Sequence, residues 1–242
     1  MTDTDPFHLH PELRSVIKPA AESFFRDFDL SVLDARAAED GDPIDWRTSD
    51  EEREAGRREW LKDSWDQDLW IFGYGSLMWD PSVEFDEVRH AHCHGYQRSF
   101  CLWVEGGRGS KEEPGLMLAI DEGGNCEGLA FRVQADKLDH ETFVLFRREM
   151  IISAYRPTWL NLDTKDGPIE ALGFVANHDY EGIIPDIPMH DQAKMISRAE
   201  GFLGTNFDYL SNTHDHLKLL EIEDTYVSEL YAAVDNLRDT SI

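Results

Sequence analysis

Cysteine is scarce in this sequence, with only Cys93, Cys101 and Cys126 among 242 residues. No two of them are spaced as a CxxC pair, and their number is odd. This pattern argues against a disulfide framework and against a zinc finger, because both need paired cysteines. The chain is long enough to build one hydrophobic core with an additional extension, so the fold is expected to depend on packing.

Basic residues are also few. Against 49 aspartates and glutamates stand 23 lysines and arginines, which gives a formal net charge of −26 at pH 7. A field of this sign repels phosphate backbones and anionic membranes, so neither nucleic acid nor membrane is expected as a partner. A small anionic substrate would gain no long-range attraction, and an enzyme of this composition must hold it with local hydrogen-bond donors.

Long hydrophobic runs are missing as well, and no stretch approaches the length of a membrane span. The N-terminal residues MTDTDPF are acidic and lack the apolar core of a secretion signal. We therefore expect a cytoplasmic protein. The sequence does not indicate its oligomeric state.

The composition and the pattern of apolar residues change near residue 67. Residues 1–66 are acidic and contain four prolines, and we interpret them as an N-terminal extension, called the arm below. Ser49 and Glu52 have the form of a capping box, which predicts a helix running to about Lys62. Apolar residues at partial helical spacing predict a short amphipathic piece that docks on the body: Leu13, Val16, Ile17, Phe24, Phe25 and Phe28. Residues 67–242 are the expected main domain.

The main domain begins with apolar segments separated by glycine-rich turns. This texture predicts strands at residues 69–72, 99–104, 115–120, 127–133, 158–162 and 169–175. Two dipeptides, Gly123-Gly124 and Asp166-Gly167, predict hairpin turns. The expected sheet is curled or forms an open barrel.

Helical periodicity appears at two places in the main domain. Leu138, Thr142, Leu145 and Glu149 share one face of a predicted helix that lies between the two expected hairpins. From about residue 189 the pattern predicts two or three further helices, with a break at residues 201–204. The fold class is therefore α+β, with helices packed around the sheet.

The most pronounced local motif is Phe72-Gly73-Tyr74-Gly75-Ser76-Leu77, a turn that directly follows an apolar strand. Glycines let the backbone bend and approach a ligand, so that successive N–H groups can converge on a carboxylate or an oxyanion. Most Gly-x-Gly turns bind nothing, and the nucleotide-binding patterns GxGxxG and GxxxxGK[ST] are absent. GxSxG is absent too, so Ser76 is a poor hydrolase nucleophile.

Glu149 lies at the end of the predicted amphipathic helix, four residues after Leu145. A carboxylate aligned with an apolar stripe loses solvent, which raises its pKa and suits it to transferring protons near neutrality. From spacing alone, a solvated glutamate paired with Arg147 or Arg148 is the preferred interpretation.

Three further candidates have weaker signals. His90, His92 and His94 alternate, so a strand would place them on one face, where they could ligate zinc; a polar sheet face is the commoner outcome. Arg108 lies in the glycine-rich loop GGRGS, where its guanidinium could clamp a substrate carboxylate or stay in solvent. Tyr209 could supply a hydroxyl to a pocket or belong to the core.

Four segments, taken together and in this order, resemble the ChaC family of gamma-glutamylcyclotransferases. They are LWIFGYGSLMW (69–79), GRGS followed by PGLMLAI (107–120), FRREMIISAYRPTWL (146–160) and GFLGTNFDYL (201–210). The first and third are the most specific, and the resemblance covers about residues 67–220. The arm carries no recognisable motif, and its deletion to about residue 45 is expected to leave the catalytic residues in place.

The resemblance implies a mixed sheet that closes into a partial barrel, with flanking helices, no cofactor and no metal. It implies cleavage of glutathione, a small-molecule substrate, to 5-oxoproline and Cys-Gly, with Glu149 as the proton shuttle. The turn then holds the gamma-glutamyl group through backbone amides, and Arg108 and Tyr209 are candidate substrate contacts. The full set of expected binding residues is Phe72, Gly73, Tyr74, Gly75, Ser76, Leu77, Arg108 and Tyr209. Two alternatives are a cyclotransferase acting on other gamma-glutamyl amides and a non-catalytic gamma-glutamyl-binding regulator.

Overall fold

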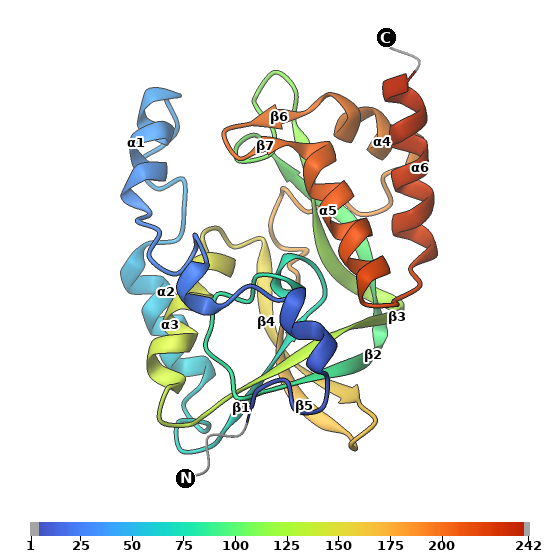
Figure 1. Ribbon diagram of the computed structural model, residues 1–242. Helices are drawn as coiled ribbons and strands as arrows, with labels where there is room; N and C mark the ends of the chain where they lie inside the picture. The colour runs from blue at the N-terminus through green and yellow to red at the C-terminus, as the bar shows by residue number, and fades with distance from the viewer. Residues whose placement is uncertain (1–4, 240–242) are drawn as a thin grey trace.

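A five-stranded barrel organises the chain in the computed structural model, which describes residues 5–239 (Figure 1). Its strands pair in the order β1-β3-β2-β4-β5, and the barrel closes through parallel pairing of β1 with β5. The other neighbours in this order are antiparallel. The strands are β1 (Leu69–Gly73), β2 (Glu87–Val104), β3 (Gly115–Val133), β4 (Tyr155–Asp163) and β5 (Ile169–Ala176). The expected mixed sheet that closes on itself is confirmed.

Helices flank the barrel in two groups (Figure 1). One group is α1 (Ser31–Glu39), α2 (Asp50–Trp60) and α3 (Leu138–Glu149), and the other is α4 (Met189–Arg198), α5 (Asn206–Leu219) and α6 (Thr225–Asp239). Short 3-10 helices are η1 (Pro11–Ser15), η2 (Ala20–Glu22) and η3 (Ser76–Met78), and β6 (Glu200–Gly201) pairs with β7 (Gly204–Thr205). None of the described helices is both long and apolar enough to span a bilayer.

The hairpin turn predicted at Gly123-Gly124 is wrong. The two segments predicted at residues 115–120 and 127–133 are one continuous strand, β3, which runs antiparallel to β2 along its length. The glycines take positive φ values where the register of β2 shifts between His94 and Tyr96. They therefore bend a long two-stranded ribbon at a bulge, a role that also favours glycine. The turn that joins β2 to β3 lies instead at residues 105–114.

The other elements agree better with the sequence. Asp166-Gly167 joins β4 to β5 as a hairpin, and the amphipathic helix is α3. Three helices follow from residue 189, and Gly201 and Gly204 separate the first from the second. Ser49 and Glu52 form both hydrogen bonds of the predicted capping box at the start of α2.

The arm is packed against the barrel and its helices. Leu13 and Ile17 are buried in the main core, although this part of the arm forms 3-10 turns rather than an amphipathic α-helix. Pro11 and Pro19 interrupt the chain there, because proline has no N–H to continue a helical ladder. In α2 the buried Arg57 donates to the side chains of Thr142 and Asp139, which ties this helix to α3.

Candidate active site

The glycine turn lies between the end of β1 and η3, beneath the side chain of Tyr209. A Cβ at Gly73 would lie 3.1 Å from the backbone carbon of Leu77, and one at Gly75 would lie 3.6 Å from the Tyr209 hydroxyl. Only glycine leaves both spaces open. Within the described residues, the backbone N–H groups of Gly75, Ser76 and Leu77 donate to no protein acceptor. Unpaired amides at a buried turn are costly, and successive free N–H groups at a turn are typical of an anion-binding site.

Two side chains hold this turn in place from behind. Arg98 is buried, and its Nε donates to the Tyr74 carbonyl at 2.7 Å while its Nη1 pairs with Asp224 at 2.9 Å. The Tyr74 hydroxyl donates to the Phe174 carbonyl at 2.7 Å. The peptide that precedes Gly75 is therefore fixed at both its backbone and its side chain, and the amides of the turn are held ready for a ligand.

Glu149, the last residue of α3, does not lie in solvent. Its side chain is 14% exposed, and its Oε1 accepts from Arg148 Nε at 2.9 Å. Arg148 is itself only 4% exposed and donates through Nη2 to Ser76 Oγ at 2.9 Å. One guanidinium thus fixes the carboxylate beside the glycine turn. The solvated ion pair that spacing alone favoured is not what the fold builds.

Burial raises the pKa of the Glu149 carboxyl above its usual range, and the charge and hydrogen bond of Arg148 act in the opposite direction. Among described carboxyl groups whose pKa departs clearly from the usual value, Glu149 is the one shifted upward. All the others are shifted downward by hydrogen bonds or ion pairs. A raised carboxyl pKa brings the protonated and ionised forms closer in free energy near neutrality, as a proton-transfer group requires.

Three buried tyrosine hydroxyls lie within range of the Glu149 charge. Burial is the main cause that raises the pKa values of Tyr74, Tyr155 and Tyr209, and the Glu149 charge raises them further. All three phenols therefore stay protonated at neutral pH and can act as hydrogen-bonding groups but not as bases. Tyr155 donates to the Leu118 carbonyl at 2.9 Å. Glu149 is left as the group of this cluster that can exchange a proton.

The motif GFLGTNFDYL explains how Tyr209 reaches the cluster. Gly204 takes φ of +98°, and Thr205 and Asp208 then form a capping box that starts α5. Asn206 is fully buried and makes two hydrogen bonds with the backbone of Leu116 in β3, its Oδ1 accepting at 2.7 Å and its Nδ2 donating at 2.8 Å. These contacts dock the first turn of α5 on the barrel and direct Tyr209 toward Gly75.

Arg108 lies near Tyr209. Its Nη1 donates to the Thr205 carbonyl at 3.2 Å, and its charge lowers the pKa of the Tyr209 hydroxyl. Burial lowers the pKa of Arg108, and the Asp208 carboxylate counteracts this effect. The guanidinium is half-buried next to the cluster and keeps donors free for a ligand.

The three histidines at positions 90, 92 and 94 do not form one cluster. The rings of His92 and His94 stack at 4.2 Å, and His94 contacts Asn125 and Asp163. His90 instead faces the arm, where its ring lies 4.8 Å from that of His10. The three imidazoles share a sheet face as strand alternation predicts, but they do not meet at one point.

Sequence reasoning missed three residues of the site, Arg98, Arg148 and Tyr155. Arg148 was considered only as a surface partner of Glu149, and Tyr155 lies inside the segment 146–160 without a role. The sequence holds no local signal for Arg98 or Arg148, because their chain neighbours are polar or charged. Their contacts with Tyr74, Ser76 and Leu118 span at least 24 positions in the chain, so these pairings were not readable from the sequence.

The fold and the site together define the class of protein, and comparison with known proteins agrees. A yeast gamma-glutamylcyclotransferase specific to glutathione has a crystal structure that matches this one with a TM-score of 0.65 at 18% identity, over 71% of this chain and 97% of that one. At that identity the likeness shows a shared fold. The described barrel with its flanking helices is thus the gamma-glutamylcyclotransferase fold.

The sequence assigns the family. The model of ChaC-like proteins matches residues 69–237, and the chain belongs to this family. It is 39% identical over 170 residues to the glutathione-specific gamma-glutamylcyclotransferase of Escherichia coli, covering 70% of this chain and 74% of that protein. It is 31% identical over 178 residues to human glutathione-specific gamma-glutamylcyclotransferase 1, covering 71% and 80%. The arm lies outside the family match.

Proposed function

We propose that this protein is a gamma-glutamylcyclotransferase that cleaves glutathione to 5-oxoproline and Cys-Gly, with Glu149 as general base and acid. The observation that carries the proposal is a buried carboxylate of raised pKa beside a turn with three unpaired amides. The names of the relatives support glutathione as the substrate. A cytoplasmic location remains a prediction from the sequence.

The reaction is intramolecular, so the enzyme need not bring two reactants together. The alpha-amine of the glutamyl group attacks its own gamma-carbonyl carbon, and a five-membered lactam forms. The bond between that carbon and the cysteine nitrogen then breaks. Glu149 takes one proton from the ammonium before attack and gives it to the departing nitrogen as the C–N bond breaks. The attacking nitrogen then loses its second proton to the same carboxylate, which passes it on to the Cys-Gly amine. Two protons leave the glutamyl nitrogen and two reach the departing nitrogen, so no net proton is gained or lost when Cys-Gly leaves as an ammonium.

The remaining groups act on charge and position. The amides of Gly75, Ser76 and Leu77 can hold the alpha-carboxylate or the tetrahedral oxyanion, and either use explains why no protein acceptor satisfies them. Arg108 has free donors for a substrate carboxylate near Tyr209. Tyr209 stays protonated and directs its hydroxyl to Gly75, where it can orient the glutamyl group.

Substrate choice tests the proposal. With equal concentrations of reduced glutathione and gamma-glutamyl-alanine, we expect 5-oxoproline from glutathione and little from the dipeptide. Mass spectrometry of both mixtures over time measures the two rates. Comparable rates would instead identify a cyclotransferase with a broader range of gamma-glutamyl amides, and absence of product from both would favour a binding protein.

The pH dependence follows from the state of Glu149. The base must be ionised to accept a proton. We therefore expect kcat/KM to be at its maximum above the pKa of Glu149 and to fall as the pH drops through that pKa. Because burial raises that pKa, we expect the acid limb above the usual range of a glutamate side chain. A pH profile at constant ionic strength measures it. An acid limb in the ordinary carboxyl range would contradict the assigned environment.

A further inference from the structure

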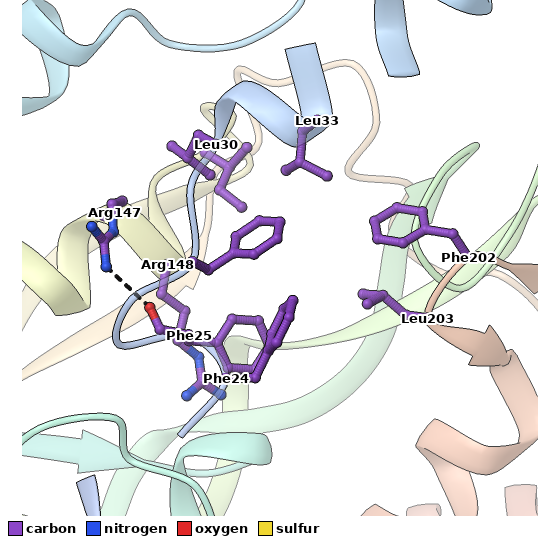
Figure 2. Close-up of a pocket in the computed structure, with 10 residues that line it drawn as sticks. Phe24, Phe25, Leu30, Leu33, Arg147, Arg148, Phe202 and Leu203 are labelled. Carbon is purple, nitrogen blue, oxygen red and sulfur yellow. Dashed lines mark hydrogen bonds between the residues drawn. The ribbon is translucent and has the colours of Figure 1, made fainter. Parts of the chain in front are cut away.

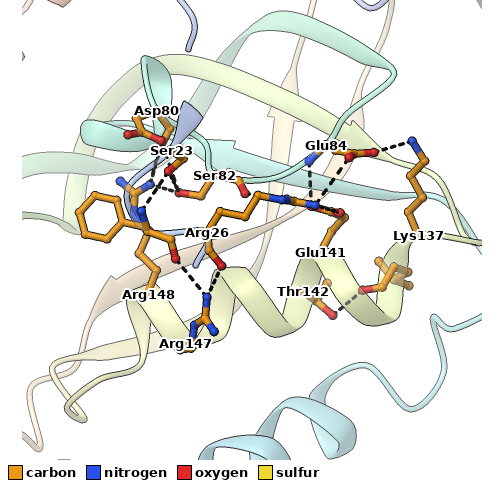
Figure 3. Close-up of polar contacts among 12 residues, drawn as sticks. Ser23, Arg26, Asp80, Ser82, Glu84, Lys137, Glu141, Thr142, Arg147 and Arg148 are labelled. Atoms are coloured by element: carbon orange, nitrogen blue, oxygen red, sulfur yellow. Dashed lines mark hydrogen bonds and ion pairs between the residues drawn. The ribbon is translucent and has the colours of Figure 1, made fainter. Parts of the chain in front are cut away.

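We propose that arm residues Ser23, Phe25 and Arg26 position the catalytic carboxylate by holding Arg148 in place. The inference rests on the proposed role of Glu149 and adds to it a part of the chain outside the family match. The arm is then a component of the active site, so removing residues 1 to about 45 should lower the rate even though the catalytic residues remain in the chain. Its contacts reach Arg148 by two routes, one through an aromatic ring and one through Ser82 (Figure 3).

The first route is direct. The ring of Phe25 lies over the guanidinium of Arg148, with 4.2 Å from the Arg148 Cζ to the ring centroid. The two residues belong to a largely apolar pocket between the arm and the turn that joins β6 to β7 (Figure 2). A cation over an aromatic face is attracted by the negative face of the ring, and the attraction is stronger where little water reaches it. Phe25 therefore closes one face of Arg148 while hydrogen bonds hold its edge.

The second route passes through Ser82. This residue is fully buried and takes φ of +63°, an uncommon conformation for serine. Ser23 donates its hydroxyl to Ser82 Oγ at 3.1 Å, and Arg26 donates to the Ser82 carbonyl at 3.0 Å. Arg148 also donates to Ser82 Oγ and to the Asp80 carbonyl. The arm thus fixes the loop whose oxygens hold the edge of Arg148.

Two arginine contacts anchor this part of the arm on α3. Arg26 makes a bidentate pair with the buried Glu141 at 2.7 and 2.8 Å. Arg147 donates to the backbone carbonyls of Phe25 and Arg26. The segment is therefore fixed relative to the helix that ends in Glu149, which is the property a positioning element needs.

The consequence for Glu149 is electrostatic. The Arg148 guanidinium pairs with Glu149 at 2.9 Å and lies 3.7 Å from the buried Asp80 carboxylate. The hydroxyls of Tyr74, Tyr155 and Tyr209 lie within range of the Glu149 charge. Of these Arg148 is the one positive charge, and it favours the ionised form. A guanidinium that loses its fixed orientation stabilises the carboxylate less, so the pKa of Glu149 rises and a smaller fraction is ready to act as base.

Three substitutions of Phe25 test this inference. We expect Phe25→Ala and Phe25→Leu to lower kcat about tenfold or more, because small displacements of a catalytic group are costly. Phe25→Tyr keeps the aromatic face and should restore the rate. Phe7→Ala is the matched control, since Phe7 is an arm phenylalanine whose ring lies under a different arginine, Arg14, at 4.9 Å. Thermal midpoints separate these effects from loss of fold.

A measurement without turnover distinguishes failure of this inference from failure of the proposed function. Carbon-13 NMR of labelled glutamate follows the Glu149 carboxyl, and the resonance missing in Glu149→Gln assigns it. We expect its pKa to rise in Phe25→Ala and Phe25→Leu and to return in Phe25→Tyr. An unchanged pKa in all folded variants overturns the positioning role, whether or not the parent cleaves glutathione.

A different observation points to a metal site at the other end of the arm. The ligand atoms of His10, Glu12 and His90 all lie within 4.8 Å of one another, with 3.2 Å from His10 Nδ1 to Glu12 Oε1. His10 and Glu12 come from the arm and His90 from β2, so a bound ion would join them. We infer that this cluster binds a divalent transition metal such as zinc.

The donor set suits this assignment. Two imidazoles and one carboxylate are a common set for zinc, with bonds of about 2.0–2.2 Å and an open position for water. Ligand atoms around such an ion are about 3.3 Å apart on that geometry, so small side-chain movements would complete the site. The His10 side chain is mostly buried and that of Glu12 mostly exposed, which leaves one side open to solvent.

The amount of zinc bound per molecule tests this proposed site. After treatment with a chelator and dialysis against micromolar zinc, the full chain without a tag should retain one zinc per molecule. His10→Ala and His90→Ala should bind it at least tenfold more weakly, whereas His178→Ala, in an exposed pair with Asp121, should bind as the parent does. Equal zinc content in all four proteins would show binding at surface histidines only and overturn the site. Turnover uses no metal in our proposal and should survive chelation.

Discussion

Replacing Glu149 by glutamine should remove nearly all turnover of glutathione while leaving the fold intact. Glutamine keeps the size of the side chain and can still accept from Arg148, so packing at the end of α3 changes little. It cannot take a proton from the substrate ammonium. Acid and base groups contribute about a hundredfold to ten-thousandfold, and a group that serves both proton steps belongs at the upper end. Steady-state rates and thermal midpoints measure both effects.

The control for this variant must be a carboxylate of the same helix outside the site. Asp139→Asn serves, because the Asp139 carboxylate is exposed and contacts Arg58 and the buried Arg57, away from the glycine turn. Its rate should stay within about twofold of the parent, since the exposed pair with Arg58 is worth about 0–1 kcal/mol and Arg57 keeps Glu54 and Thr142 as partners. Arg148 is unsuitable as a control because it is buried and contacts Ser76. A Glu149→Gln rate within about tenfold of the parent would remove Glu149 from the mechanism.

Gly75→Ala should reduce turnover by about a hundredfold, because the added methyl group would displace the glutamyl group and a displacement of about 1 Å can cost that much. The added Cβ would lie 3.1 Å from Leu118 Cδ2 and 3.6 Å from the Tyr209 hydroxyl, in the space proposed for the glutamyl group. The leucine side chain can shift by a few tenths of an ångström, so the fold should survive. Most of the loss should therefore appear in activity, which kinetics and a thermal melt separate.

A glycine away from the site provides the comparison. A Cβ at Gly56 in α2 would meet no atom within 4 Å, and the residue is exposed. Gly56→Ala should keep full turnover and gain about 0.5–1 kcal/mol of stability, because alanine loses less entropy in a helix. If Gly75→Ala behaved in the same way, the space above the turn would not be where substrate binds.

The sequence predicted the secondary structure correctly where contacts between residues close in the chain determine it. The capping box at Ser49 and the apolar stripe of α3 gave the right helices, because their contacts are three or four residues apart. The glycine pair at 123–124 misled the prediction because the same residues serve a hairpin turn and a bulge. Only the length of the partner strand β2 decides between them, and that is a long-range property.

In the candidate site, too, local features were predicted from the sequence and long-range contacts were not. Glu149 and the turn stand out in the sequence, yet spacing alone favoured a solvated ion pair for the glutamate. Its burial depends on Arg148, Ser76 and the three tyrosines, which come from separate elements and meet only in the folded barrel. The arm carried no motif, and its contact with Arg148 became visible through the packing of Phe25.

The central claim is that the glutamyl amine, rather than water, attacks the gamma-carbonyl. Incubation with glutathione in water enriched in oxygen-18, followed by mass spectrometry, distinguishes the two routes directly. Cyclisation predicts 5-oxoproline and Cys-Gly in equal amounts, with no heavy oxygen in the 5-oxoproline. Glutamate that carries the heavy oxygen would mean hydrolysis and would contradict the account.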